Sequence, residues 1–148
     1  MTIHSKSSAP AKKLRVLFVC LGNACRSPMA EAIALQEASD VLEPSSAGLY
    51  PLGEIPEATQ QTLLRSGYSA AGLSSKPITA QAWNDADLVI NLSGRIRDIA
   101  FDDPAKVEDW DVSDPYGASP AFYQAILEEL QERIRALADR LRRQRKSQ

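Results

Sequence analysis

A cysteine and an arginine are separated by five residues near the start of the chain, in the sequence Cys20-Leu21-Gly22-Asn23-Ala24-Cys25-Arg26. The preceding residues 14–19 are mostly apolar and β-branched, which indicates a strand, and Pro28 suits the first turn of a helix. In a tight loop between a strand and a helix, main-chain N–H groups form a concave nest for an anion, and the helix N-terminus adds its positive dipole end. The spacing therefore predicts a site for a tetrahedral oxyanion.

The reactive side chains of this loop have complementary chemistry. The donors that bind an anion would also stabilise Cys20 as a thiolate, the nucleophilic form of cysteine. The planar guanidinium of Arg26 can bind two phosphate oxygens at once and keeps its charge. Ser27 is placed to donate its hydroxyl to the Cys20 sulfur. We therefore expect Cys20 to be a nucleophile and Arg26 to hold the transferred phosphoryl group.

The elements that must position this loop alternate between strands and helices. Strand character recurs at residues 41–46, 86–92 and 107–112. Helices are expected from Pro28 to Gln36, over residues 57–65 and over residues 120–143, where apolar residues recur at spacings of three and four. This alternation predicts an α/β fold whose parallel sheet is covered by helices on both faces, with the ligand site at the carboxyl ends of the strands.

The composition is that of one globular domain, with 148 residues and a formal net charge of -2. We expect a flexible tail over residues 1–13 and a single domain over residues 14–148. The nearly neutral charge and the lack of a long apolar run predict no nucleic-acid or membrane partner, and the tail lacks the apolar segment of a secretory signal, so we expect a cytoplasmic protein. Two cysteines and one histidine, His4, offer no zinc-type cluster, and we expect no metal and no cofactor.

The segment from Val19 to Ala32, VCLGNACRSPMAEA, resembles the signature of the low-molecular-weight protein tyrosine phosphatases and of the related thioredoxin-coupled arsenate reductases. The resemblance implies a flavodoxin-like three-layer αβα sandwich with a four-stranded parallel sheet in the order 2-1-3-4. It implies hydrolysis of phosphate monoesters, in phosphotyrosine proteins or small aryl phosphates, through a phosphocysteine intermediate. It also implies that the loop from Leu21 to Ser27 binds phosphate and that Ser46 hydrogen-bonds Asn23. We expect a monomer or a weak dimer.

Asp114, followed by Pro-Tyr-Gly, resembles the acid loop of this family. When a phosphate ester is hydrolysed, the alcohol or phenol leaves poorly as an anion. With no histidine in the predicted domain, a carboxylate must protonate the departing oxygen. Asp103 also precedes a proline, but it lies before the fourth strand, at the wrong end of the sheet. The resemblance places Tyr116 in the pocket wall, and Tyr50 is expected on the opposite wall.

Several alternatives stay open. Many family members have a histidine near Leu73 that supports the loop serine, and this chain has none there, which leaves the support of Ser27 undetermined. Cys25 either forms a reversible disulfide with Cys20, as the resemblance implies, or is a small buried residue.

An arsenate reductase would use the same oxyanion loop, but no cysteine follows Cys25, so it would need an external thiol. A non-catalytic module that binds phosphate or a phosphoprotein is the remaining alternative.

Overall fold

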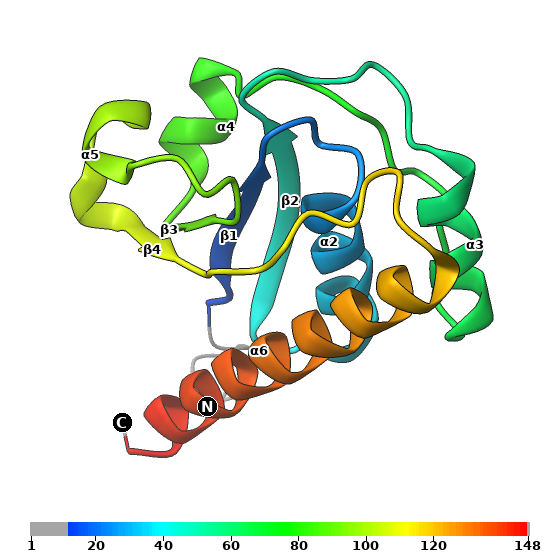
Figure 1. Cartoon of the computed structure of the whole chain (residues 1–148). Coiled ribbons are helices and arrows are strands. Elements are labelled where there is room, and N and C mark those ends of the chain that lie inside the picture. Colours follow the sequence, from blue (N-terminus) through cyan, green and yellow to red (C-terminus); the bar gives the residue numbers. More distant parts are fainter. Residues whose placement is uncertain (1–11, 148) are drawn as a thin grey trace.

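The computed structural model describes residues 12–147 and is built on one parallel sheet (Figure 1). The strands lie in the order β2-β1-β3-β4, and their bounds are Leu14–Cys20 for β1, Leu42–Gly48 for β2, Leu88–Asn91 for β3 and Val107–Asp109 for β4. Each neighbouring pair is parallel. The predicted α/β class and the order 2-1-3-4 are confirmed. Most of the predicted tail, including His4, lies outside the described residues.

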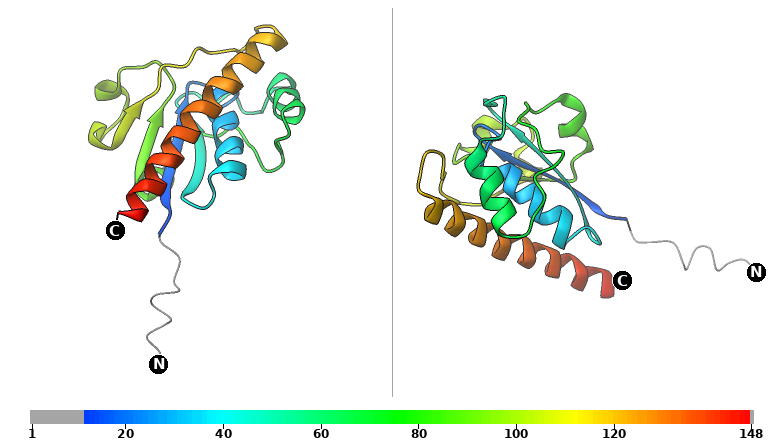
Figure 2. Two further views of the ribbon diagram at one scale, coloured as in Figure 1. Left: turned by 90° about the horizontal axis from the view of Figure 1, so that it is seen from below. Right: turned by 90° about the vertical axis from the view of Figure 1, so that its right-hand side faces the viewer.

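Helices cover both faces of the sheet, which completes the predicted three layers (Figure 2). One face carries α2 (Arg26–Glu37), α3 (Glu57–Arg65) and α6 (Pro120–Lys146), and the other carries α4 (Ala80–Asp85), α5 (Arg97–Ala100) and the 3₁₀ turn Pro104–Lys106. Successive side chains of β1 point to opposite faces, so Val16 and Phe18 enter the core under α2 and α6 while Leu17 and Val19 enter the smaller core on the other side.

The long C-terminal helix α6 begins and packs as its sequence predicts. The Ser119 side chain accepts a hydrogen bond from the Phe122 N–H, and Pro120 occupies the first turn. The buried stripe of the helix, which includes Ile126, Leu130 and Ile134, packs against α2 and α3. No helix within residues 12–147 combines the length and the apolar character that a membrane span requires.

The strands nearest the predicted acid loop are shorter than the sequence indicates. β3 is Leu88–Asn91 instead of residues 86–92, and β4 is Val107–Asp109 instead of residues 107–112. The Leu92 and Val112 carbonyls both accept hydrogen bonds from the Arg26 side chain, so the backbone beyond each strand turns toward that guanidinium. The short helices α4 and α5 were not predicted.

The end of β2 contacts the loop that follows β1, and this contact requires a glycine. A Cβ atom at Gly48 would lie 2.8 Å from the Asn23 main-chain nitrogen and 2.9 Å from the Asn23 Cβ. Both neighbouring atoms belong to a fully buried residue that cannot easily move away. The absence of a side chain at position 48 is therefore what allows β2 to close one side of the loop.

Gly48→Ala should destabilise the protein by about 1–3 kcal/mol, because overpacking of a tight contact forces backbone shifts. The measurement is the free energy of unfolding from urea titration. Gly22→Ala is the matched control, since the nearest atom to a Cβ there lies 3.8 Å away, an ordinary contact distance. Equal stability of the two variants would show that the contact between Gly48 and Asn23 is not tight.

Candidate active site

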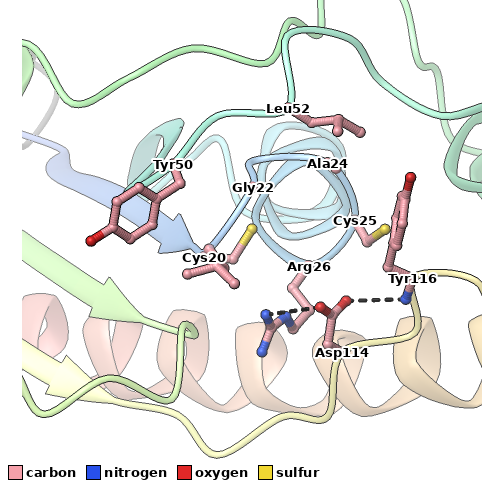
Figure 3. Close-up of a pocket in the computed structure, with 10 residues that line it drawn as sticks. Cys20, Gly22, Ala24, Cys25, Arg26, Tyr50, Leu52, Asp114 and Tyr116 are labelled. Carbon is pink, nitrogen blue, oxygen red and sulfur yellow. Dashed lines mark hydrogen bonds and ion pairs between the residues drawn. The ribbon is translucent and has the colours of Figure 1, made fainter.

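The loop between β1 and α2 forms the floor of a pocket of about 330 Å³ at the carboxyl end of the sheet (Figure 3). The pocket brings together residues from three separate segments of the chain: Cys20, Leu21, Gly22, Ala24, Cys25 and Arg26 from the loop, Tyr50 and Leu52 after β2, and Asp114 and Tyr116 after β4. All of these except Leu52 were predicted site residues. The remaining predicted residues, Asn23, Ser27 and Ser46, are buried behind the floor.

The main-chain carbonyls of the loop are bonded to the surrounding structure. The Cys20, Leu21 and Gly22 carbonyls accept hydrogen bonds from the main-chain N–H groups of residues 49, 50 and 52, and the Ala24 carbonyl accepts one from the Thr59 hydroxyl on α3. By contrast, no main-chain N–H group of residues 21–25 donates to another group in the described part of the chain. The N-terminus of α2 likewise has no side-chain cap. The loop therefore offers a set of free donors next to a helix N-terminus, as an anion site requires.

Asn23 is the centre of a buried hydrogen-bond network behind this loop. Its backbone has a φ of +46°, a left-handed conformation that asparagine tolerates better than most residues. Its Nδ2 donates to Ser27 Oγ at 2.7 Å and to Ser46 Oγ at 3.1 Å, and its Oδ1 accepts from the Lys76 N–H at 3.0 Å. Both N–H groups and the oxygen of the amide thus have a partner, and these bonds include the one to Ser46 that the resemblance implies.

Two groups set the direction of the network: the Glu31 carboxylate orients Ser46, and the Lys76 N–H holds Asn23 Oδ1 so that Asn23 Nδ2 faces both serines as a donor. Ser46 Oγ donates to Glu31 Oε1 at 2.5 Å, and an ionised carboxylate can only accept. Ser46 must then accept from Asn23, and Ser27 also accepts from Asn23. The Ser27 hydroxyl proton is left for the Cys20 sulfur, which lies 2.9 Å from Ser27 Oγ. The alternative acceptor, the Ala47 carbonyl, is farther away at 3.4 Å.

Two adjacent residues, Ser75 and Lys76, support the loop although the chain lacks a histidine near Leu73. Ser75 Oγ donates to the Gly22 carbonyl at 2.9 Å, and the neighbouring Lys76 N–H holds the Asn23 side chain. Neither Glu31 nor Ser75 was predicted as a site residue. Glu31 follows Ser27 by four residues on α2, so helical periodicity places both on the same face, and this signal was available in the sequence. The contact of Ser75 with Gly22 arises only in the tertiary structure.

The Arg26 guanidinium is buried and fixed along one edge. Its Nη1 donates to the Leu92 carbonyl at 2.6 Å and to the Val112 carbonyl at 3.1 Å. The side chain is 7% exposed, yet Nε has no hydrogen-bond partner among residues 12–147. The remaining nitrogen, Nη2, lies 3.6 Å from Asp114 Oδ2. The edge formed by Nε and Nη2 is therefore available for a bidentate contact with an oxyanion.

Asp114 and the two tyrosines surround the mouth of the pocket. The other oxygen of Asp114, Oδ1, accepts a hydrogen bond from the Tyr116 N–H at 3.0 Å, which fixes the carboxylate beside Arg26. Figure 3 shows Tyr50 and Tyr116 on opposite sides of the Cys20 sulfur. Both rings are largely exposed, Tyr50 at 70% and Tyr116 at 58%. The pocket thus has a rigid polar floor and exposed aromatic walls.

Cys25 differs from Cys20 in its surroundings. Both cysteines are free, and Cys25 Sγ lies 3.4 Å from Tyr123 Oη on α6. Burial raises the pKa of the Cys25 thiol above that of an ordinary cysteine, and the hydrogen bonds from Thr59 and Tyr123 oppose this only in part. Cys25 therefore keeps its proton at neutral pH. Within the described chain, no group of three or more His, Cys, Asp or Glu side chains is arranged to hold a metal ion.

Comparison with known proteins identifies the relatives of this chain. The sequence model of the low molecular weight phosphotyrosine protein phosphatases matches residues 15–147. A protein-arginine-phosphatase of Bacillus subtilis is 35% identical over 150 residues, covering 88% of this chain and 99% of the relative. An arsenate reductase of Bacillus licheniformis is 33% identical over 135 residues, covering 86% of this chain and 96% of the relative. Among solved structures, an arginine phosphatase of Geobacillus stearothermophilus superposes with a TM-score of 0.81 at 28% identity, covering 90% of this chain and 96% of that structure.

Ser46→Ala should lower the free energy of unfolding by about 1–3 kcal/mol, because it leaves a buried Asn23 N–H without an acceptor. Ser45→Ala is the matched control, since Ser45 is the adjacent residue of β2 and its hydroxyl makes no hydrogen bond to the described chain. Urea unfolding of both variants measures the difference. A loss in Ser46→Ala no larger than in Ser45→Ala would contradict the network.

Proposed function

Because the chain belongs to the low molecular weight phosphotyrosine protein phosphatase family, we propose that it hydrolyses phosphotyrosine in proteins through a phosphocysteine intermediate. One observation carries the proposal. Cys20, Arg26 and the loop residues Leu21, Gly22, Ala24 and Cys25 line one pocket, and within residues 12–147 neither the main-chain N–H groups of these loop residues nor the Arg26 Nε has a hydrogen-bond partner. A phosphoryl group has a central atom for the sulfur to attack and oxygens for all of these donors.

In the first step, the Cys20 thiolate attacks phosphorus, so that a sulfur–phosphorus bond forms as the bond to the ester oxygen breaks. The three non-bridging oxygens gain charge, and the loop N–H groups with Nε and Nη2 of Arg26 bind them. Protonated Asp114 transfers its proton to the departing phenol oxygen. Its position beside Arg26, with Oδ2 3.6 Å from Nη2, supports this role because the acid must stand next to the bound phosphoryl group.

In the second step, water attacks the phosphocysteine, Asp114 takes a proton from that water, and the sulfur–phosphorus bond breaks to release inorganic phosphate and the thiolate. The Ser27 hydroxyl, 2.9 Å from the sulfur, supports the charge of the departing thiolate. Cys25 is unsuited to be the nucleophile, because burial raises the pKa of its thiol and its Sγ faces Tyr123.

The walls of the pocket favour an aryl leaving group. Tyr50, Tyr116 and Leu52 present aromatic and aliphatic surface to whatever is attached to the phosphate. Among the lining residues, Asp114 is the one carboxylate, and it already faces Arg26. The guanidinium part of a phosphoarginine would find no second carboxylate there, whereas a phosphotyrosine ring would contact the two tyrosines.

Relatives of this chain are named arginine phosphatase and arsenate reductase, so phosphoarginine and arsenate are the alternatives to phosphotyrosine as the substrate. Arsenate resembles phosphate in shape and charge, and its reduction to arsenite requires two electrons from thiols. The chain has two cysteines, both in the loop, so a reductase would need an external thiol to complete the cycle. A module that binds phosphate without turnover would not require Asp114 beside Arg26.

The proposal is tested by assaying hydrolysis of a phosphotyrosine peptide in a chelator with reductant present, beside a phosphoarginine peptide and an arsenate-reduction assay supplied with thioredoxin, glutaredoxin or low-molecular-weight thiols. We expect phosphotyrosine hydrolysis, loss of turnover in Cys20→Ser, and a phosphocysteine trapped by acid quench at position 20. Faster turnover of the phosphoarginine peptide would identify phosphoarginine, and not phosphotyrosine, as the substrate. Thiol-dependent arsenite formation without hydrolysis would identify a reductase, and phosphate binding without turnover would identify a binding module.

Asp114→Asn should lower the rate of phosphoryl transfer by roughly 10²–10⁴-fold, because general acid catalysis of this kind contributes that factor. The loss should be larger for phenyl phosphate than for p-nitrophenyl phosphate, since the nitrophenol leaves more easily without a proton. Single-turnover kinetics with the two esters measure the effect. Asp111→Asn is the control, because this exposed aspartate on the same segment does not line the pocket. Equal losses for both esters in Asp114→Asn would argue that Asp114 is not the acid.

A further inference from the structure

A second groove lies beside the candidate active site, on the far side of Tyr50. It has a volume of about 540 Å³ and is lined by Leu49 and Tyr50 after β2 and by Arg95, Ile96 and Ile99 after β3. Tyr50 lines both this groove and the pocket over Cys20. The two cavities are therefore neighbours that meet at one exposed aromatic side chain, and a ligand that passes this ring reaches from the pocket to the groove.

The chemistry of the groove is apolar with one positive charge. Ile96 is 66% exposed and Ile99 is 82% exposed, which is unusual for large aliphatic side chains that lie close together. The Arg95 guanidinium lies 5.9 Å from the centre of the Tyr50 ring, a cation–π distance, and none of the lining residues is acidic. Arg95 forms no ion pair with any carboxylate in the described part of the chain.

The backbone that carries Arg95 is held in place by hydrogen bonds. The buried Asn91 donates through Nδ2 to the Arg95 carbonyl at 2.9 Å, and the Arg95 N–H donates to Ser93 Oγ at 3.1 Å. Asn91 is itself the last residue of β3. The guanidinium thus projects from a fixed turn at the carboxyl end of the sheet, as a recognition residue beside the pocket would need to do.

We propose that this groove, here called the Arg95 groove, binds the peptide segment that flanks the phosphorylated residue of the substrate and selects an acidic side chain together with an aliphatic one. This inference rests on the proposed phosphatase function. An extended peptide advances about 3.3 Å per residue, so a side chain one to three positions from the phosphorylated tyrosine can pass Tyr50 and reach the groove. The acidic side chain pairs with Arg95, and the aliphatic one covers Ile96 and Ile99. Arg95 is thus a specificity-determining residue.

The test compares kcat/KM for two phosphotyrosine peptides that differ only in having Glu or Lys at the flanking positions, with p-nitrophenyl phosphate as a substrate that does not reach the groove. The wild-type protein should prefer the acidic peptide by about 1.5-fold to fivefold, the range expected for one exposed ion pair. Arg95→Glu should reverse the preference. High salt should reduce it, because exposed charges are screened.

Arg15→Glu is the matched control, since it makes the same charge change at the start of β1, at the opposite end of the sheet. An equal shift in both variants would overturn the inference, because the effect would then come from the net charge. Equal rates for the two peptides in the wild-type protein would also overturn it while leaving the phosphatase function intact. Failure of the wild-type protein to hydrolyse any of the three esters would overturn the proposed function and this inference together.

Discussion

The structure depends on the direction of one chain of hydrogen bonds, from Cys20 through Ser27, Asn23 and Ser46 to Glu31. The Glu31 carboxylate accepts from Ser46, and the Lys76 N–H holds Asn23 Oδ1, so Asn23 Nδ2 donates to both serines and the Ser27 hydroxyl proton is available to the sulfur. Several unusual local features serve this arrangement. Asn23 adopts a left-handed backbone conformation, and the absence of a side chain at Gly48 allows the end of β2 to approach Asn23. A buried network of this kind stabilises only when every member is satisfied, and each polar atom of the Asn23 side chain has its partner.

Arg26 connects the loop to the far half of the sheet. Its Nη1 donates hydrogen bonds to the Leu92 and Val112 carbonyls, which follow β3 and β4. The segments after these strands therefore position the Arg26 guanidinium. Both carbonyls lie just beyond the observed strand ends. The contact of Arg26 with both carbonyls explains why a lysine would be a poor substitute, because one ammonium cannot bind two main-chain carbonyls and still present a planar pair of donors to an oxyanion.

The parts that could be predicted without the family resemblance are those set by local pattern, whereas the long-range contact of Ser46 with Asn23 was predicted only from that resemblance. The β1 run, the loop with its cysteine and arginine, and the apolar stripe of α6 each lie within one short segment, and alternation of strands and helices led to the parallel sheet. The helices α4 and α5 have six and four residues, too few for a period to be recognised. Two further contacts join segments more than 40 residues apart: the hydrogen bond of Ser75 to Gly22 and the position of Arg95 over Tyr50. No local sequence pattern indicates contacts of this kind.

The floor and the walls of the pocket have different roles in the proposed function: the floor holds the phosphoryl group, and the walls contact the group attached to it. In the proposed function, the floor binds the tetrahedral phosphoryl group and supplies the nucleophile, and the residues of the floor do not contact the group attached to the phosphate. Cys20 is 2% exposed, whereas Tyr50 is 70% exposed and Ile99 is 82% exposed. Substitutions in the walls can therefore change which ester enters without disturbing the network behind the loop. Relatives of similar length and fold carry the names of arginine phosphatases and arsenate reductases. A shared floor with different walls and different access to thiols is a physical basis for such divergence. In this chain the wall residues of the pocket lie after β2 and β4.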